Sequence, residues 1–109
     1  MLNELARSAG VSITVDEALV PVSPVVAAAA ELLGIDPMHI ANEGRLVAFI
    51  APHAVERALE ALRAVEGCAD AVAIGRTSSE TPGMVLLNTS FGGRRVMDQL
   101  VGDPLPRIC

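Results

Sequence analysis

The stretch Val-Ser-Ile-Thr-Val-Asp at residues 11–16 decides the fold class, because apolar and polar side chains alternate along it. This alternation is typical of a half-buried β-strand, in which successive side chains point to opposite faces of a sheet. Gly10 separates the strand from a short amphipathic helix expected over residues 2–9. On the other side, Ser23-Pro24 predicts a helix start, and Gly34 predicts its end. A strand between helices favours a layered α/β architecture.

The rest of the chain continues this alternation of helix and strand patterns. The other expected elements are a helical turn at 37–41, a buried strand at 46–51, a helix at 53–66, strands at 71–74 and 84–87 with a loop at 75–83 between them, and a segment at 94–101 that fits either a helix or a strand. The helix at 53–66 has the clearest period, with an apolar face of Val55, Ala58, Leu59, Leu62 and Val65. We therefore expect an α/β (α+β) fold, with a mixed sheet of about four strands and helices packed on it.

Composition excludes several classes of function. The chain has 109 residues, 51% of them hydrophobic, which suits one domain with a real core. Its net charge is −5 and its eight basic residues are all Arg, so it lacks the lysine of a Walker A motif and of Schiff-base chemistry. Scattered charges and only two aromatic residues argue against nucleic-acid binding. No apolar stretch predicts a signal peptide or a membrane span, so we expect a cytoplasmic protein without membrane association.

Cys109 is the residue with the clearest chemical potential. It ends the stretch Gly-Asp-Pro-Leu-Pro-Arg-Ile-Cys at residues 102–109, which two prolines stiffen towards an extended arm. Such an arm reaches up to ~26 Å, so it could deliver a thiol to distant sites, but it could also be a frayed tail that ends in cysteine. Cys68 fits a buried small hydrophobic residue better. His39 and His53 lack the spacing of a metal site.

Three further segments each allow a chemical and a structural interpretation. Asn42-Glu43-Gly44-Arg45 lies at the expected junction of a helical turn and a strand, where a carboxylate could act as a general base or merely accompany a helix cap. Gly75-Arg76-Thr77 and the segment 91–95, Phe-Gly-Gly-Arg-Arg, combine glycine with arginine. Their amides and guanidinium groups could hold phosphate, or they could be simple turns.

Five segments of the chain resemble motifs of a known family. The ending Pro-Arg-Ile-Cys at 106–109 and the Asn-Glu-Gly motif at 42–44 are similar to those of the hydrogenase maturation factor HypE family. The Gly75-Arg76 and Gly92-Gly93-Arg94 turns and the run at 33–37 are also similar, and the wider aminoimidazole-ribonucleotide-synthetase-like superfamily shares them. The resemblance implies the C-terminal domain of that family over residues 1–103, followed by an extended tail at 104–109.

The resemblance also implies a mechanism. Cys109 would accept a carbamoyl group from the carbamoyltransferase HypF, ATP with magnesium would phosphorylate the carbamoyl oxygen, and Glu43, oriented by Asn42, would remove the nitrogen proton. The resulting cyano group would pass to iron on a HypC–HypD scaffold, for the NiFe-hydrogenase centre. The family's larger N-terminal domain implies a homodimer and holds most of the nucleotide site, so no cofactor is expected on this chain alone. Two alternatives remain: a non-catalytic ferredoxin-like regulatory or oligomerisation module, and a fragment of another ATP-using enzyme of the superfamily.

Overall fold

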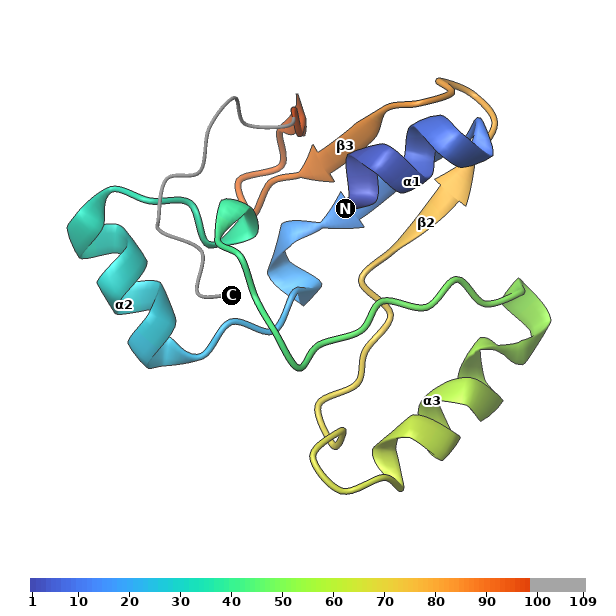
Figure 1. Ribbon diagram of the computed structural model, residues 1–109, viewed down its shortest axis with the longest axis horizontal. Coiled ribbons are helices and arrows are strands. Elements are labelled where there is room, and N and C mark those ends of the chain that lie inside the picture. The colour runs from blue at the N-terminus through green and yellow to red at the C-terminus, as the bar shows by residue number, and fades with distance from the viewer. Residues whose placement is uncertain (99–109) are drawn as a thin grey trace. The chain divides into compact units, whose positions relative to one another are not determined.

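The computed structural model describes residues 1–98, which form two compact units (Figure 1). The sheet unit consists of Met1–Val20 and residues 50–98, and the α2 unit consists of Pro21–Phe49. Among residues 1–98, no helix is both long and apolar enough to cross a membrane.

A mixed four-stranded sheet forms the centre of the sheet unit, as the alternation of patterns predicted. Its strands are β1 (Ser12–Asp16), β2 (Gly75–Ser78), β3 (Val85–Asn88) and β4 (Arg94–Val96), in the order β2-β1-β3-β4. β1 pairs antiparallel with β2 and parallel with β3, while β3 pairs antiparallel with β4. The parallel pair requires a long connection, and the chain from Glu17 to Met84 supplies it.

The core of the sheet unit lies between the sheet and α1 (Leu2–Ala9), which contacts β1 and β3. Ile13 and Val15 of β1 are buried beside their parallel partners Val85 and Leu87, and α1 adds the buried Ala6. Each fully buried branched side chain contributes about 1.5–3 kcal/mol relative to an exposed one. The alternation seen at residues 11–16 therefore has its expected cause: one face of β1 is in the core.

The other helix of the sheet unit is α3 (Val55–Arg63), which follows a 3₁₀ turn at Pro52–Ala54. Its predicted apolar face is confirmed at Val55, Ala58, Leu59 and Leu62, which are half-buried while the residues between them are exposed. The helix predicted at 53–66 is shorter than expected, and Val65, the last residue of the predicted face, lies beyond its end and is 56% exposed. No residue of α3 is fully buried. The pattern thus identified the correct face of the helix but not how completely it is covered.

The α2 unit contains the helix α2 (Pro24–Leu33) and a 3₁₀ turn at Pro37–His39. Both starts follow the predicted chemistry: the Ser23 hydroxyl accepts a hydrogen bond from the Val26 amide at 3.3 Å, and the Asp36 carboxylate accepts one from the Met38 amide at 2.9 Å. The turn ends at His39, two residues earlier than the sequence predicted.

The expected buried strand at 46–51 is wrong. No strand is assigned between residues 45 and 51, and Leu46 is 69% exposed. An apolar run indicates a tendency to be buried but does not specify the partner that a strand needs. The four strands of the sheet unit pair with one another and do not include this segment.

The strand expected at 71–74 is displaced along the chain. Pairing with β1 begins at Gly75, opposite Val15, and runs to Ser78, opposite Ser12. The chain turns into a 3₁₀ helix at Glu17–Leu19 immediately after β1, so β1 offers residues 71–73 no backbone to pair with. The predicted loop at 75–83 is correspondingly wrong over its first four residues. The ambiguous segment at 94–101 begins with β4, and its last residues lie outside the described part.

Gly75 should be essential to the pairing of β2 with β1. A Cβ atom at this position would lie 2.0 Å from the backbone oxygen of Thr14, which a side-chain rotation cannot relieve. We expect Gly75→Ala to lower the free energy of unfolding, measured by urea titration, by about 1–3 kcal/mol. In the control Gly93→Ala, the new Cβ meets only the Thr89 hydroxyl, at 3.1 Å, so the loss should be smaller. Equal losses for the two variants would contradict this account.

Candidate functional site

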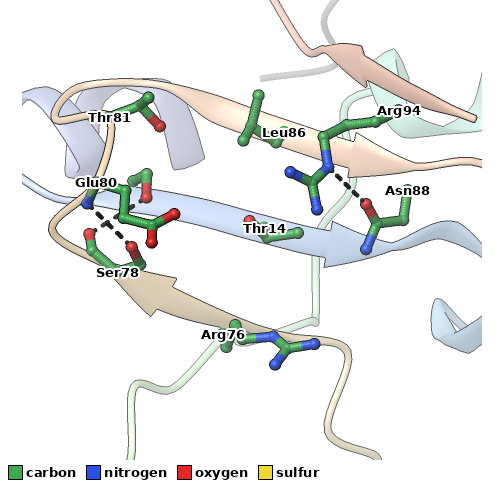
Figure 2. A pocket seen from close by; sticks show the side chains of 9 residues that line it. Thr14, Arg76, Ser78, Glu80, Thr81, Leu86, Asn88 and Arg94 are labelled. Carbon is green, nitrogen blue, oxygen red and sulfur yellow. Dashed lines mark hydrogen bonds between the residues drawn. The ribbon is translucent and has the colours of Figure 1, made fainter.

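A polar hollow of about 350 Å³ lies in the sheet unit (Figure 2). Its lining comes from all four strands and the loop after β2: Ser12, Thr14, Arg76, Ser78, Glu80, Thr81, Leu86, Asn88 and Arg94. The register explains why these side chains gather on one face. Thr14 pairs with Arg76 on one side and with Leu86 on the other, while its neighbours Ile13 and Val15 belong to the opposite face, which α1 covers.

A chain of side-chain hydrogen bonds orients the arginine at one end of the hollow. The Nε–H of Arg94 donates to Oδ1 of Asn88 at 3.1 Å, and the Asn88 amide donates to Oδ1 of Asp16 at 2.5 Å. Asp16, Asn88 and Arg94 are successive cross-strand partners on β1, β3 and β4, so the ladder itself brings them together. The network holds the Arg94 guanidinium group inward over β3, as Figure 2 shows.

The opposite end of the hollow carries a carboxylate. Figure 2 places Glu80 at the far end from Asn88 and Arg94. The Glu80 amide donates to the Ser78 hydroxyl at 3.0 Å, which fixes the loop that follows β2. The buried Ser12 donates its hydroxyl to the Ser78 carbonyl at 3.2 Å and ties the edge of β2 to β1. The hollow is therefore basic at one end and acidic at the other.

The predicted Asn42 and Glu43 belong to the α2 unit, whereas the residues that line the hollow belong to the sheet unit. Both are exposed in a bend, where Gly44 has a φ of 70°. The expected helix-to-strand junction is wrong, since the 3₁₀ turn ends at His39 and no strand follows. Among the described residues, none forms a hydrogen bond or ion pair with the Glu43 carboxylate. Cys109, the third predicted site residue, lies outside the described residues.

Cys68 and the two histidines have structural surroundings. The expectation that Cys68 is buried is wrong: its free thiol is only half-buried, in the turn between α3 and β2. That turn is built from backbone hydrogen bonds on both sides of Cys68 and from Arg63, which donates to the Ala71 carbonyl at 2.9 Å. His39 lies 3.4 Å from the Asp36 carboxylate, and His53 is exposed. Residues 1–98 contain no group of three or more potential metal ligands.

Sequence reasoning missed several members of the hollow. It singled out Arg76 and Arg94, in separate segments, but not Thr14, Glu80 or Asn88. The polar half of the alternation at residues 11–16 was the available signal, because it marks a sheet face without apolar cover. These polar residues did not show which strands lie on either side of β1.

Comparison with known proteins identifies the class to which this fold belongs. The family model described as "AIR synthase related protein, C-terminal domain" matches residues 1–86. The chain therefore belongs to the family of AIR synthase-related C-terminal domains, as the resemblance of its motifs implied.

Within this family, the chain is similar to carbamoyl dehydratase HypE, which confirms the resemblance. It is 45% identical to that protein from Rhodobacter capsulatus over 99% of the chain and 32% of the relative. With carbamoyl dehydratase HypE of Escherichia coli it shares 38% identity over 100% of the chain and 32% of the relative. The chain spans about a third of the length of these curated relatives.

Solved structures agree with this assignment. A crystal structure of hydrogenase maturation protein HypE matches with a TM-score of 0.90 and 35% identity, over 99% of this chain and 36% of that one. A structure of HypE in complex with ATP matches with a TM-score of 0.87 and 33% identity, over 94% and 32%. A structure of a HypE–HypF complex matches with a TM-score of 0.84 and 35% identity, over 91% and 32%.

The hydrogen bond between Asn88 and Asp16 should couple their contributions to stability. We expect the double-mutant cycle of Asp16→Ala, Asn88→Ala and the double variant to yield a coupling energy of about 1 kcal/mol. Either single replacement already breaks this part-buried hydrogen bond to a charged group, so the second replacement breaks no further bond. Urea unfolding of the four proteins measures it. Additive losses would show that the two side chains do not act as a unit.

Proposed function

We propose that this chain supplies the C-terminal part of a carbamoyl dehydratase that makes cyanide ligands for NiFe-hydrogenase maturation. The observation that carries the proposal is similarity to carbamoyl dehydratase HypE over the whole chain, up to and including Cys109. A non-catalytic regulatory module would explain the mixed sheet but would leave the Pro-Arg-Ile-Cys ending without a role.

In this proposal Cys109 carries the substrate throughout the reaction. Its sulfur bears a carbamoyl group, –S–C(=O)–NH₂, whose oxygen is a poor leaving group until ATP phosphorylates it and releases ADP. The nitrogen loses its first proton as the phosphorylated intermediate, –S–C(=NH)–OPO₃²⁻, forms. Loss of the second proton then expels phosphate and leaves the nitrile, –S–C≡N. The net change is removal of one water from the carbamoyl group, with ATP converted to ADP and phosphate. Pro104 and Pro106 precede the cysteine in the sequence.

Glu43 is the proposed base that removes the nitrogen proton, with Asn42 as the group that orients the carbamoyl moiety. Two features of the bend support this role. The Glu43 carboxylate is exposed and has no partner among the described residues, so it is accessible to a substrate. The alternative role in a helix cap loses its basis, because the preceding 3₁₀ turn ends four residues before Glu43 and is capped by Ile40.

The proposed partners follow from the relatives. A HypE structure contains ATP and another contains HypF, which supports ATP as co-substrate and a HypF-type carbamoyltransferase as donor. We propose that magnesium accompanies the nucleotide and that a HypC–HypD scaffold accepts the cyano group. We place the nucleotide site and a homodimer interface mainly on the two thirds of the relatives that this chain does not span. The absence of lysine from the chain agrees with that division.

Replacing Glu43 should impair chemistry without impairing the fold. In the complete enzyme that carries this chain, we expect Glu43→Gln to slow nitrile formation roughly a hundredfold to ten-thousandfold, the usual effect of losing a general base. The melting temperature should stay near that of the parent, since no described residue depends on this carboxylate. Mass spectrometry of the Cys109 peptide distinguishes the carbamoyl from the cyano adduct.

Glu31→Gln provides the matched control for this experiment. Glu31 is an exposed glutamate of α2 in the same unit, so its replacement removes the same charge away from the bend. We expect normal nitrile formation in this variant. Full dehydration by the Glu43→Gln enzyme would assign the proton transfer to another group.

Cys109 should be the reactive thiol of the pair. Alkylation under native conditions, followed by peptide mass mapping, should label Cys109 first, because Cys68 is half-buried in a hydrogen-bonded turn. Deleting Cys109 from the complete enzyme should abolish carbamoyl acceptance while leaving the melting temperature unchanged. The matched variant Cys68→Ala should still accept the group. Faster labelling of Cys68, or acceptance without Cys109, would refute the proposed carrier.

A further inference from the structure

We propose that Asp36 and His39 are positioning residues, which hold the Asn42-Glu43 bend in place for proton removal from the carbamoyl nitrogen. This role rests on the proposed function, because the position of the bend matters to the reaction only if Glu43 is the base. All of these residues belong to the α2 unit, so their placement is set within one compact body.

Hydrogen bonds fasten the segment between α2 and the bend. The amide of Ile35 donates to the carbonyl of Ala30 in α2 at 2.9 Å. The 3₁₀ turn at Pro37–His39 begins two residues later and contacts α2. It ends where the Ile40 amide donates to the carbonyl of the first residue of the turn at 3.2 Å. The chain is therefore held against α2 as far as Ile40.

The bend that follows has no such bonds. Within the part of the chain that the structure describes, residues 41–44 form no backbone hydrogen bond. Residues 35–40 are half-buried, whereas residues 41–50 are exposed. The position of Glu43 relative to α2 is therefore set by the turn before it.

Asp36 holds this turn with both oxygens of its carboxylate. Oδ1 accepts a hydrogen bond from the Met38 amide at 2.9 Å, and Oδ2 lies 3.4 Å from Nδ1 of His39. The His39 side chain is only 18% exposed, so water and salt screen this contact less than they screen a pair on the open surface. One carboxylate thus ties the backbone and a side chain of the turn together, and the direction in which the chain enters the bend depends on it.

Proton transfer makes this direction important. A general base must come within about 2.6–3.2 Å of the atom that carries the proton. A misplacement of about 1 Å can slow a reaction about a hundredfold. Because the turn ends only a few residues before Glu43, fixing the turn limits the positions that the Glu43 carboxylate can take.

Rates of nitrile formation in the complete enzyme test this role. In enzyme already carbamoylated on Cys109, we expect Asp36→Ala and His39→Ala to slow nitrile formation about tenfold to a hundredfold, the effect of a misplaced base. The KM for ATP should stay unchanged, because the positioning acts on the base and not on nucleotide binding. Equal changes in the KM for ATP and in the rate would overturn the proposal.

Conservative variants separate positioning from direct chemistry. His39→Asn should restore the rate, since the asparagine amide nitrogen can occupy the place of Nδ1 and still donate to Asp36. Asp36→Asn should lose less than Asp36→Ala, because asparagine still caps the Met38 amide, and it also keeps the test valid if Asp36→Ala does not fold. A His39→Asn enzyme as slow as His39→Ala would show that the ring itself is required and would overturn the proposal.

His53→Ala is the matched control. His53 is exposed in the other 3₁₀ turn that begins with proline, Pro52–Ala54, and the residue before that turn makes no side-chain cap. Its replacement removes the same ring from a turn of the same type, and we expect a normal rate of nitrile formation. Equal losses for His39→Ala and His53→Ala would contradict the proposed role.

Combination with Glu43→Gln shows whether the effect acts through the base. If it does, adding His39→Ala to the Glu43→Gln enzyme should slow nitrile formation further by no more than about twofold, because the base is already absent. The full loss in that background would overturn the positioning role.

Failure of this role and failure of the proposed base give different results. Normal rates in the Asp36 and His39 variants, beside a slow Glu43→Gln enzyme, would overturn the positioning alone. A normal rate in Glu43→Gln would refute the base and the positioning together.

Discussion

The pairing of β1 with strands on both sides is the constraint on which the rest of the sheet unit depends. β1 is antiparallel to β2 and parallel to β3, with Ile13 and Val15 buried beneath α1. Because side chains alternate along a strand, this burial also sends Thr14 to the open face. A slip of one residue would exchange the two faces, exposing the core residues and closing the polar hollow. The core and the hollow are thus two consequences of one register.

The parallel pairing of β1 and β3 also determines where chemistry can be placed. It sets Asp16 beside Asn88, and the adjoining hairpin sets Asn88 beside Arg94, which orders the basic end of the hollow. It requires a long crossover, and this crossover contains the α2 unit with its Asn42-Glu43 bend. The turn after β3 is fastened as well, since Ser90 donates its amide and hydroxyl to Glu17 at 2.9 and 3.2 Å. Hydrogen bonds thus tie the strands and the turn after β3 together within the sheet unit, while the bend lies in an exposed connection.

The proposed base and the polar hollow differ in how their side chains are held. A base such as Glu43 must be accessible to a substrate carried by another segment. Its exposure, with no partner among residues 1–98, meets that demand. In the hollow, by contrast, hydrogen bonds to Asn88 and from Asn88 to Asp16 hold the side chain of Arg94 in place.

Local sequence determined the helices and the central strand. Gly10, Ser23 and Gly34 act on their immediate neighbours through backbone conformation and capping, so their effects could be inferred without knowing the fold. The motif at 42–44 and Cys109 could be singled out in the same way, through resemblance to the HypE family. The tertiary structure alone decided which strands pair. It moved β2 from 71–74 to Gly75–Ser78 because β1 ends at Asp16, and it left Leu46 exposed. It also joined Arg76 and Arg94 in one hollow with Thr14, Glu80 and Asn88. Strand partners and sites shared between strands are contacts between residues distant in sequence, and no local pattern encodes the partner.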